Sequence, residues 1–348
     1  MQYDQMLPTM GVGSYATPGW LFPFREAMAN GRTGPDDVAE AFEDATRIVI
    51  ADQIDAGVDV IADGELHRQR FVYEMYDRIE GLTRVSATRR LGVWGYDRTP
   101  RFIANERLHA PNGLGLRAEF EMLQRLAPGH NLKIALPGPL TFLLNIEPGS
   151  AYGADPSADD QLLADIVDML RREVDELASA GANFIQIDEP GLTHLPARVA
   201  SDAAPSAINA VIGAHNERSA VHVCYGNNAS RPFSRRDMSR LLPAIDALNT
   251  STLLLEFANR EMAEIELLAE LSTRFDIAAG VIDVKSFYVE TADDVAERLG
   301  KVLQHVPIER LIVTADCGFS AIPRWLARAK MNAMVAGAEQ VRRSLLSA

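Results

Sequence analysis

Residues 220–226 carry two potential metal ligands in a short run that reads as a strand, with the sequence Ala-Val-His-Val-Cys-Tyr-Gly. Because side chains alternate across a strand, His222 and Cys224 project to one side while Val221 and Val223 project to the other. Taken alone, the run supports two interpretations about equally. It is either a metal-binding pair or a core strand that holds a small buried thiol.

Two more residues of suitable type follow other apolar runs. They are Cys317, the second of the chain's two cysteines, and Glu256. One imidazole, two thiolates and one carboxylate suit a tetrahedral zinc ion. Separately, Glu256 is more simply an acid paired with an arginine, and Cys317 a thiol packed in a turn. The joint occurrence of all four residues favours zinc.

The charge of this ligand set indicates what the metal would do. Two thiolates and a carboxylate outweigh the two positive charges of zinc, so the ion would be a weak Lewis acid and poorly suited to activating water. Zinc still deprotonates a coordinated thiol, whereas a free thiol with a pKa of about 8.5 is mostly protonated at neutral pH. The set therefore predicts activation of a substrate thiol as a nucleophile.

A fold that gathers strand ends is needed to bring these residues together. Short apolar runs occur at 10–14, 58–63, 132–136, 184–187, 220–224, 252–255, 277–282 and 311–314. Helical periods are predicted at 35–56, 159–180, 204–216, 236–248, 262–273, 292–303 and 323–346. Eight apolar strands, each followed by helical material, indicate an α/β fold, a single parallel (β/α)8 TIM barrel. A doubly wound open sheet is the alternative.

The barrel is expected to span residues 1–348 as one domain, with an irregular insertion after the second strand at about 67–131 that is too long for a simple loop. In a barrel, chemistry gathers at the carboxyl ends of the strands. Polar residues follow the strand cores with regularity, and they are Ser14, Asp63, Glu65, Asp188, Glu189, His222, Cys224, Glu256, Asp283, Lys285, Asp316 and Cys317.

Composition narrows the class of partner. The formal net charge of -14 argues against binding to nucleic acid or to an anionic membrane. The first nine residues have no basic region followed by an apolar core, and no run reaches the roughly 18 apolar residues that span a bilayer. Two cysteines do not make a disulfide framework. We expect a cytoplasmic protein that acts on a small molecule.

Seven motifs, taken in order, resemble the catalytic barrel of the cobalamin-independent methionine synthase family. They are Gly13-Ser14-Tyr15, Asp63-Gly64-Glu65, Pro137-Gly138-Pro139-Leu140-Thr141, Ile185-Gln186-Ile187-Asp188-Glu189-Pro190, His222-Val223-Cys224-Tyr225, the strand that contains Glu256, and Asp316-Cys317-Gly318. The similarity runs from about residue 9 to about residue 336. It implies a zinc enzyme that binds homocysteine as a thiolate and transfers a methyl group to it, forming methionine.

The resemblance also implies roles for individual residues. The zinc ligands would be His222, Cys224, Glu256 and Cys317. Ser14 matches the position that meets the homocysteine carboxylate, while Glu65 and Asp188 match the acids that hold its ammonium group. Two carboxylates that converge on one barrel mouth repel each other unless a cation lies between them. That cation is either the substrate ammonium or one of three basic side chains, Arg68, Arg70 or Lys285.

Departures from the family pattern concern the methyl donor. The folate-dependent enzymes have two barrels, whereas this chain has room for one, and it resembles the shorter core form found in some bacteria and archaea. That form implies methylcobalamin or a corrinoid protein as donor. The insertion that contains Trp94, Tyr96, Arg98 and Arg101 does not resemble the family's folate-contacting segment.

A second departure lies at residues 283–286. The long enzymes have Asp-Ile-His-Ser there, with a histidine thought to donate a proton to the leaving group, and this chain has Asp283-Val284-Lys285-Ser286. With Asp283 beside it, Lys285 is the candidate catalytic residue. A lysine can donate a proton, orient a carboxylate or bind an anionic substrate group. It can equally form a structural ion pair with Asp283 or Asp316.

Other functions remain open at this point. Relatives with this barrel and zinc site join coenzyme M to epoxides, forming a carbon–sulfur bond, and here Lys285 or an arginine of the insertion would bind the sulfonate. Acids at positions 65 and 188 disfavour such an anionic thiol. A third interpretation is a metal-binding protein without enzymatic activity, since fold alone does not establish function. Uroporphyrinogen decarboxylase-like relatives share the fold, but their chemistry does not call for these four ligands.

Overall fold

The structure is a computed structural model that describes residues 5–68, 71–86, 101–153, 157–195, 199–200, 202–227 and 230–347. The chain divides into two compact units. The first unit comprises Met1–His67, Ala118–Ile134 and Leu254–Ala348, and the second comprises Arg68–Arg117 and Ala135–Leu253. Each is described by itself, and the expectation of a single domain stays a prediction.

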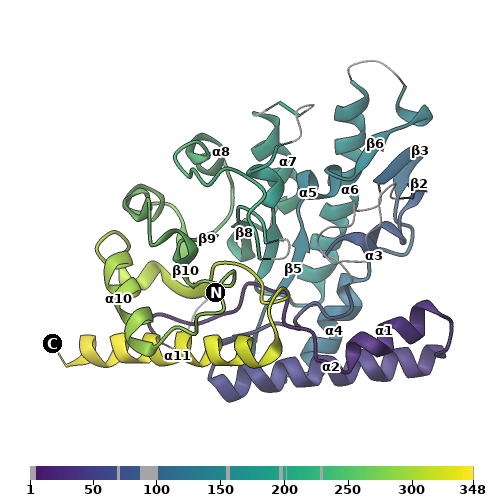
Figure 1. Ribbon diagram of the computed structural model, residues 1–348. Coiled ribbons are helices and arrows are strands. Elements are labelled where there is room, and N and C mark those ends of the chain that lie inside the picture. The colour runs from purple at the N-terminus through teal and green to yellow at the C-terminus, as the bar shows by residue number, and fades with distance from the viewer. Residues whose placement is uncertain are drawn as a thin grey trace. The chain divides into compact units, whose positions relative to one another are not determined.

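The first unit contains parallel strands flanked by long helices (Figure 1). Its strands are β1 (Val60–Ile61), β4 (Asn131–Leu132), the last three residues of β9 (Thr252–Glu256), β10 (Asp276–Ile282) and β11 (Leu311–Ala315). Its helices are α1 (Leu21–Ala29), α2 (Pro35–Ala56), most of α4 (Leu116–Leu126), α9 (Leu268–Leu271), α10 (Ala292–Val302) and α11 (Arg324–Leu346).

Strand pairing in the first unit is continued by the N-terminal segment. Strands β10 and β11 are parallel, as are β1 and β4. Between these pairs, Thr9 forms a parallel bridge to Val313, and Met10 forms one to Val60. The segment therefore joins β11 to β1. Sequence reasoning predicted a full strand at 10–14, but regular pairing is confined to these two bridges, and residues 11–18 follow an irregular path.

Helix ends in the first unit follow local sequence rules. Helix α2 begins with Pro35 in its first turn, carries two acids beside the N-terminus, and ends at Gly57 with a left-handed φ of 79°. These are the residues that helix termini favour. Helix α10 has a capping box in which the Thr291 side chain accepts from the Asp294 amide. In Figure 1 the yellow helix α11 runs beside the purple helix α2, and the two are in contact.

The second unit has a parallel core and a smaller sheet. Core strands follow the order β8 (Ser219–Val223), β7 (Ile185–Asp188) and β5 (Ile134–Pro137), the last beginning one residue before the unit. The smaller sheet pairs β2 (Glu80–Val85) with β3 (Arg101–His109) and β3 with β6 (Ile146–Pro148). Its helices are α3 (Tyr73–Tyr76), α5 (Pro139–Leu143), α6 (Ala158–Ser179), α7 (Ala203–Ile212) and α8 (Leu242–Asp246).

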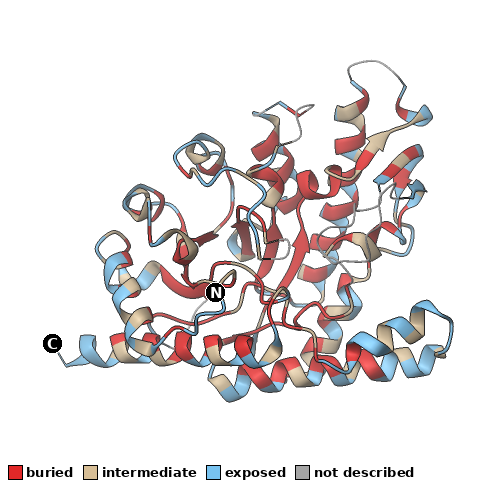
Figure 2. Cartoon of the chain, viewed as in Figure 1, coloured by how far each residue is buried: buried red, intermediate tan, exposed pale blue. Residues whose placement is uncertain are grey.

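Burial explains why the core strands read as continuous apolar runs. Every residue of β5, β7 and β8 is buried, including the polar residues at their carboxyl ends (Figure 2). Parallel strands covered on both faces show this pattern. None of the described helices is both long and apolar enough to cross a membrane. Short 3-10 helices complete the structure at η1 (Ser150–Tyr152), η2 (Pro190–Leu192), η3 (Asn216–Arg218), η4 (Ala258–Arg260), η5 (Ile265–Leu267) and η6 (Ile308–Arg310).

Most predicted elements are confirmed, and three helices are shorter than predicted. The helix predicted at 204–216 ends at Ile212 as α7. The helix predicted at 236–248 is reduced to α8, since Pro243 fits only in a first helical turn. The helix predicted at 262–273 is interrupted by left-handed backbone at Glu261, Met262 and Glu264, which leaves only η5 and α9.

The predicted insertion at 67–131 contains an antiparallel pair, β2 and β3, that the sequence analysis did not identify. Its extent as an insertion stays a prediction. Arg101 begins β3, whereas Trp94, Tyr96 and Arg98 lie outside the described residues.

Candidate functional site

The predicted metal-binding pair lies at the end of β8 in the second unit. His222 is 3% exposed and Cys224 is 4% exposed. Their ligand atoms lie within 4.8 Å of each other. Zinc bonds to nitrogen and sulfur are about 2.0–2.3 Å long, so the spacing fits two ligands of one ion. The expectation that the two side chains lie side by side is confirmed.

An acid faces this pair from the neighbouring strand. In the parallel register of β7 and β8, Asp188 is the partner of His222. Side chains of directly paired residues lie on the same face of a sheet. Asp188 is 4% exposed and accepts a hydrogen bond from Gln186 Nε2 at 2.5 Å. A buried carboxylate thus adjoins a potential metal ligand.

Backbone contacts fix the turn that follows β8. The Thr193 hydroxyl donates to the Cys224 carbonyl at 3.1 Å, and the Phe233 amide donates to the Tyr225 carbonyl at 2.9 Å. Gly226 has a φ of 94°, and a Cβ there would lie 2.0 Å from the Phe233 ring. Glycine is therefore required, and the turn orients Cys224.

Glu189 holds a turn in the second unit, a role that sequence reasoning did not assign. It is fully buried and accepts from the Leu140 and Thr141 amides, both at 2.9 Å, and from the Thr141 hydroxyl at 2.6 Å. A Cβ on Gly138 would lie 2.2 Å from its Oε2 atom. Burial raises the pKa of Glu189 to about 7, against the opposing effect of these donors. The acid thus fastens the Pro-Gly-Pro turn to the end of β7.

Three predicted site segments of the first unit are bonded to one another. The Tyr15 amide donates to the Gly64 carbonyl at 2.9 Å, and the Phe319 amide donates to the Ser14 carbonyl at 2.7 Å. A Cβ on Gly318 would lie 1.9 Å from Ser14 Oγ. The loop of Ser14, the turn of Glu65 and the turn of Cys317 are therefore held in close contact.

Glu65 has an unusual backbone. It is 5% exposed, and its φ is 56°, a left-handed value that is uncommon for a residue other than glycine. The preceding Gly64 has a φ of 78°, and a Cβ there would lie 2.6 Å from Val49 Cγ1. Backbone strain of this kind occurs often at functional sites. The turn therefore carries a buried carboxyl group, that of Glu65, which is predicted to bind the ammonium group of the substrate.

Glu256, the fourth predicted ligand, forms an ion pair in the first unit. Its side chain is fully buried, and its Oε2 lies 2.9 Å from Lys285 Nζ. Its Oε1 accepts from Asn259 Nδ2 at 3.2 Å. The structural alternatives weighed from the sequence were an arginine as the partner of Glu256, and Asp283 or Asp316 as the partner of Lys285. Instead the two pair with each other, because the lysine side chain reaches from the loop after β10 to the end of β9.

Lys285 remains charged in this position. Burial by itself would lower the pKa of its ammonium group, but the negative charges of Glu256, Cys317 and Asp316 raise that pKa above its ordinary value. Asp283 contributes differently, since its Oδ1 accepts from the Lys285 amide at 2.8 Å. It orients the backbone that carries the lysine.

Asp316 links the Glu256 and Cys317 segments. It accepts from the amides of Phe257 and Ala258 at 2.9 Å, and from the Asn259 amide at 2.7 Å and Nδ2 at 2.8 Å. Burial and the Glu256 charge raise the pKa of Asp316 to about 7, while Lys285 and the backbone donors oppose them. The acid beside Cys317 therefore holds the turn after Glu256, a role that its place in the Asp-Cys-Gly motif could have indicated.

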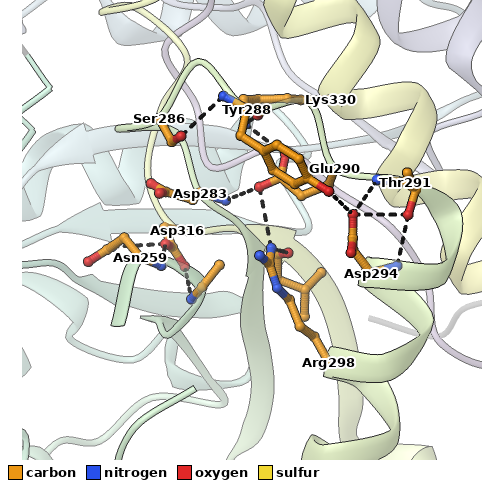
Figure 3. Close-up of polar contacts among 12 residues, drawn as sticks. Asn259, Asp283, Ser286, Tyr288, Glu290, Thr291, Asp294, Arg298, Asp316 and Lys330 are labelled. Atoms are coloured by element: carbon orange, nitrogen blue, oxygen red, sulfur yellow. Dashed lines mark hydrogen bonds and ion pairs between the residues drawn. The ribbon is translucent and has the colours of Figure 1, made fainter. Parts of the chain in front are cut away.

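A buried acid, Glu290, anchors the loop that carries Lys285 (Figure 3). The Asp283 amide donates to Glu290 Oε1 at 2.9 Å. Glu290 pairs with Lys330 Nζ at 2.7 Å, and both side chains are at most 1% exposed. Arg298 adds a contact to Glu290 at 3.3 Å. Residues of α10 and α11 thus fix the loop after β10.

This anchor predicts that one substitution that removes a charge, Glu290→Gln, lowers the free energy of unfolding strongly. Glu290→Gln leaves the Lys330 ammonium buried without its carboxylate, and removal of one partner of such a pair costs about 3 kcal/mol or more. We expect that loss in the free energy of unfolding measured by denaturant titration. Glu297→Gln, which removes an exposed pair with Lys301, should cost less than about 1 kcal/mol. Equal effects of the two substitutions would contradict the anchor.

The raised pKa of Glu189 predicts a pH dependence of stability. Because the folded carboxyl group has a pKa of about 7 against an ordinary value of 4.5, the folded state retains the proton over that interval. Its stability contribution is complete below pH 4.5 and is lost as the pH rises through 7. Glu189→Gln removes this term. The stability of the wild type relative to the variant should fall by up to about 3 kcal/mol between the two pH values, and parallel pH profiles would refute the assignment.

Comparison with known proteins places these residues in a family. A model of the family described as "Cobalamin-independent synthase, Catalytic domain" matches residues 7–340. A protein named methionine synthase from Saccharolobus solfataricus is 30% identical over 342 residues, which cover 98% of this chain and 96% of that protein.

Solved structures agree with the family match. The B12-independent methionine synthase from Shewanella sp. W3-18-1 is 26% identical with a TM-score of 0.80, covering 99% of this chain and all of that one. A putative vitamin-B12 independent methionine synthase from Listeria monocytogenes, 16% identical with a TM-score of 0.71 and covering 97% of this chain and 99% of that chain, shows the same fold. The predicted (β/α)8 class is confirmed by these neighbours. The chain therefore belongs to the cobalamin-independent synthase family, whose catalytic-domain model matches it over residues 7–340.

Proposed function

We propose that this protein is a zinc-dependent methyltransferase that methylates the thiol of homocysteine to form methionine. One observation carries the proposal. Strand pairing sets Asp188 directly beside His222, and the ligand atoms of His222 and Cys224 lie within 4.8 Å of each other. A substrate that carries both a thiol and an ammonium group matches a metal-ligand pair next to a buried acid. The Shewanella relative, whose structure was solved with selenomethionine, supports this class of ligand.

The residues that would hold zinc are His222, Cys224, Glu256 and Cys317. The donor types and the spacing of the first two fit the ion. When bound, zinc keeps a coordinated thiol deprotonated at neutral pH. Lys285 holds the Glu256 carboxylate by a charged hydrogen bond. Of the roles left open for this lysine, orientation of a carboxylate is the one that its contacts support.

Three residues would hold the carboxylate and ammonium groups of homocysteine. Ser14 would bind the carboxylate, and Glu65 and Asp188 would bind the ammonium group. Oriented this way, the thiolate attacks the methyl carbon, so that a carbon–sulfur bond forms as the bond to the donor breaks and the donor retains that electron pair. Positioning of the two reactants and formation of the thiolate would supply most of the rate enhancement.

Methylcobalamin or a corrinoid protein is the proposed methyl donor. The Saccharolobus relative is matched over 96% of its own length, so proteins of this single-barrel size bear the name methionine synthase. This supports the core form rather than a two-barrel, folate-dependent enzyme. Coenzyme M is a poorer substrate candidate, because the buried Asp188 beside His222 would repel its sulfonate.

A turnover assay tests the proposed reaction. Zinc-loaded protein is incubated with homocysteine and either methylcobalamin or methyl-folate, and methionine is quantified. We expect methionine from methylcobalamin and none from the folate. Methionine from methyl-folate alone would overturn the proposed donor. No methionine from either donor, with zinc bound and with epoxide and coenzyme M consumed instead, would overturn the proposed reaction.

Substitution of the ligands tests the metal site. Cys317→Ser and His222→Gln should each reduce bound zinc from about one ion per chain to a small fraction and abolish methionine formation. His215→Gln is the matched control, because His215 is outside the proposed ligand set and pairs with Asp175. It should retain zinc. Stoichiometric zinc and full activity in Cys317→Ser would exclude the proposed ligand set.

A further inference from the structure

A fully buried lysine lies behind the Ser14 loop, and the proposed reaction does not use it. Lys133 follows β4 in the first unit and is 0% exposed. Its Nζ atom donates to the Gly11 carbonyl at 2.6 Å and to the Val12 carbonyl at 2.7 Å, and it lies 3.9 Å from Met10 Sδ. An ammonium group removed from water is costly unless hydrogen bonds compensate. Here backbone carbonyls of one loop provide two of them.

The lysine itself is firmly held at its backbone. The Lys133 amide donates to the Ile61 carbonyl at 3.0 Å, in continuation of the β1 and β4 pairing. The side chain therefore extends from a fixed strand to the N-terminal segment. Because a trans peptide is planar, bonding the carbonyls of Gly11 and Val12 orients the Gly11–Val12 and Val12–Gly13 peptide planes, which lead into Ser14.

Other contacts fix the loop on the far side of Ser14. The Tyr15 amide is bonded to Gly64, and the Ser14 carbonyl is bonded to Phe319. Pairing with strands ends at Met10, so residues 11–14 have no regular strand ladder of their own within the described chain. Lys133 provides two contacts to this stretch on its N-terminal side.

We propose that Lys133 is a positioning residue that sets the Ser14 loop and thereby determines preference for thiols that carry a carboxylate. The inference rests on the proposed function, in which Ser14 meets that carboxylate. Lys133 does not contact substrate. It acts through two backbone carbonyls, so its removal should affect recognition of one end of the substrate and spare the other.

The test uses zinc-loaded Lys133→Met, which keeps the length of the side chain and removes the donors. Binding of homocysteine is compared with binding of 3-aminopropane-1-thiol, its analogue without the carboxylate. We expect the preference for homocysteine to fall about tenfold, the scale of a lost hydrogen bond to a charged group, with little change for the analogue. Ser14→Ala should lower the preference similarly, and the double variant no further. Equal losses for both thiols, or additive effects, would overturn the proposal.

A second measurement does not depend on the substrate. Hydrogen exchange of the Tyr15 and Phe319 amides should become faster in Lys133→Met by about tenfold or more, because both amides bond the loop that the lysine holds. Lys330→Met is the control, since Lys330 is equally buried but bonds Glu290 and the Tyr288 carbonyl. It should leave the two amides and the thiol preference unchanged. Unchanged hydrogen exchange of the two amides in Lys133→Met would refute the inference. If zinc-loaded wild-type protein does not bind homocysteine, the proposed function is refuted instead.

Discussion

Burial of charge at strand ends is the constraint on which the rest of the structure depends. Glu256 and Lys285 form a pair in which both side chains are almost entirely removed from water. Such a pair persists only if its geometry is exact and its remaining polar atoms are satisfied. Asn259 satisfies the second Glu256 oxygen, and Asp316 in turn holds Asn259. The loop after β10 and the turn before Cys317 are both organised around this requirement.

Each unit by itself brings together part of the proposed site. In the second unit, parallel pairing aligns Asp188 with His222, and the turn after β8 orients Cys224. In the first unit, hydrogen bonds join the segments of Ser14, Glu65 and Cys317. Except for His222 and Cys224, the residues of the proposed site come from segments that are far apart in sequence.

Buried lysines serve as supports in this protein, each in its own way. Lys330 neutralises Glu290 and anchors the loop that carries Lys285. Lys133 instead bonds two backbone carbonyls beside Ser14. In a chain with a formal charge of -14, buried cations can be matched by plentiful carboxylates. The Lys133 ammonium thus supports a loop through backbone carbonyls, whereas the Lys330 ammonium neutralises an acid.

Residue type and spacing alone determined the fold class, the seven motifs and the placement of His222 beside Cys224. These follow from local rules, because strand alternation and apolar periodicity need no knowledge of distant partners. Tertiary structure decided what each charged group contacts. It pairs Lys285 with Glu256. It also places Glu189 and Asp316 where each accepts hydrogen bonds from the backbone of a turn, and Lys133 where it bonds the loop that leads to Ser14. Contacts between residues tens or hundreds of positions apart depend on how strands and loops pack, and no local pattern in the sequence specifies them.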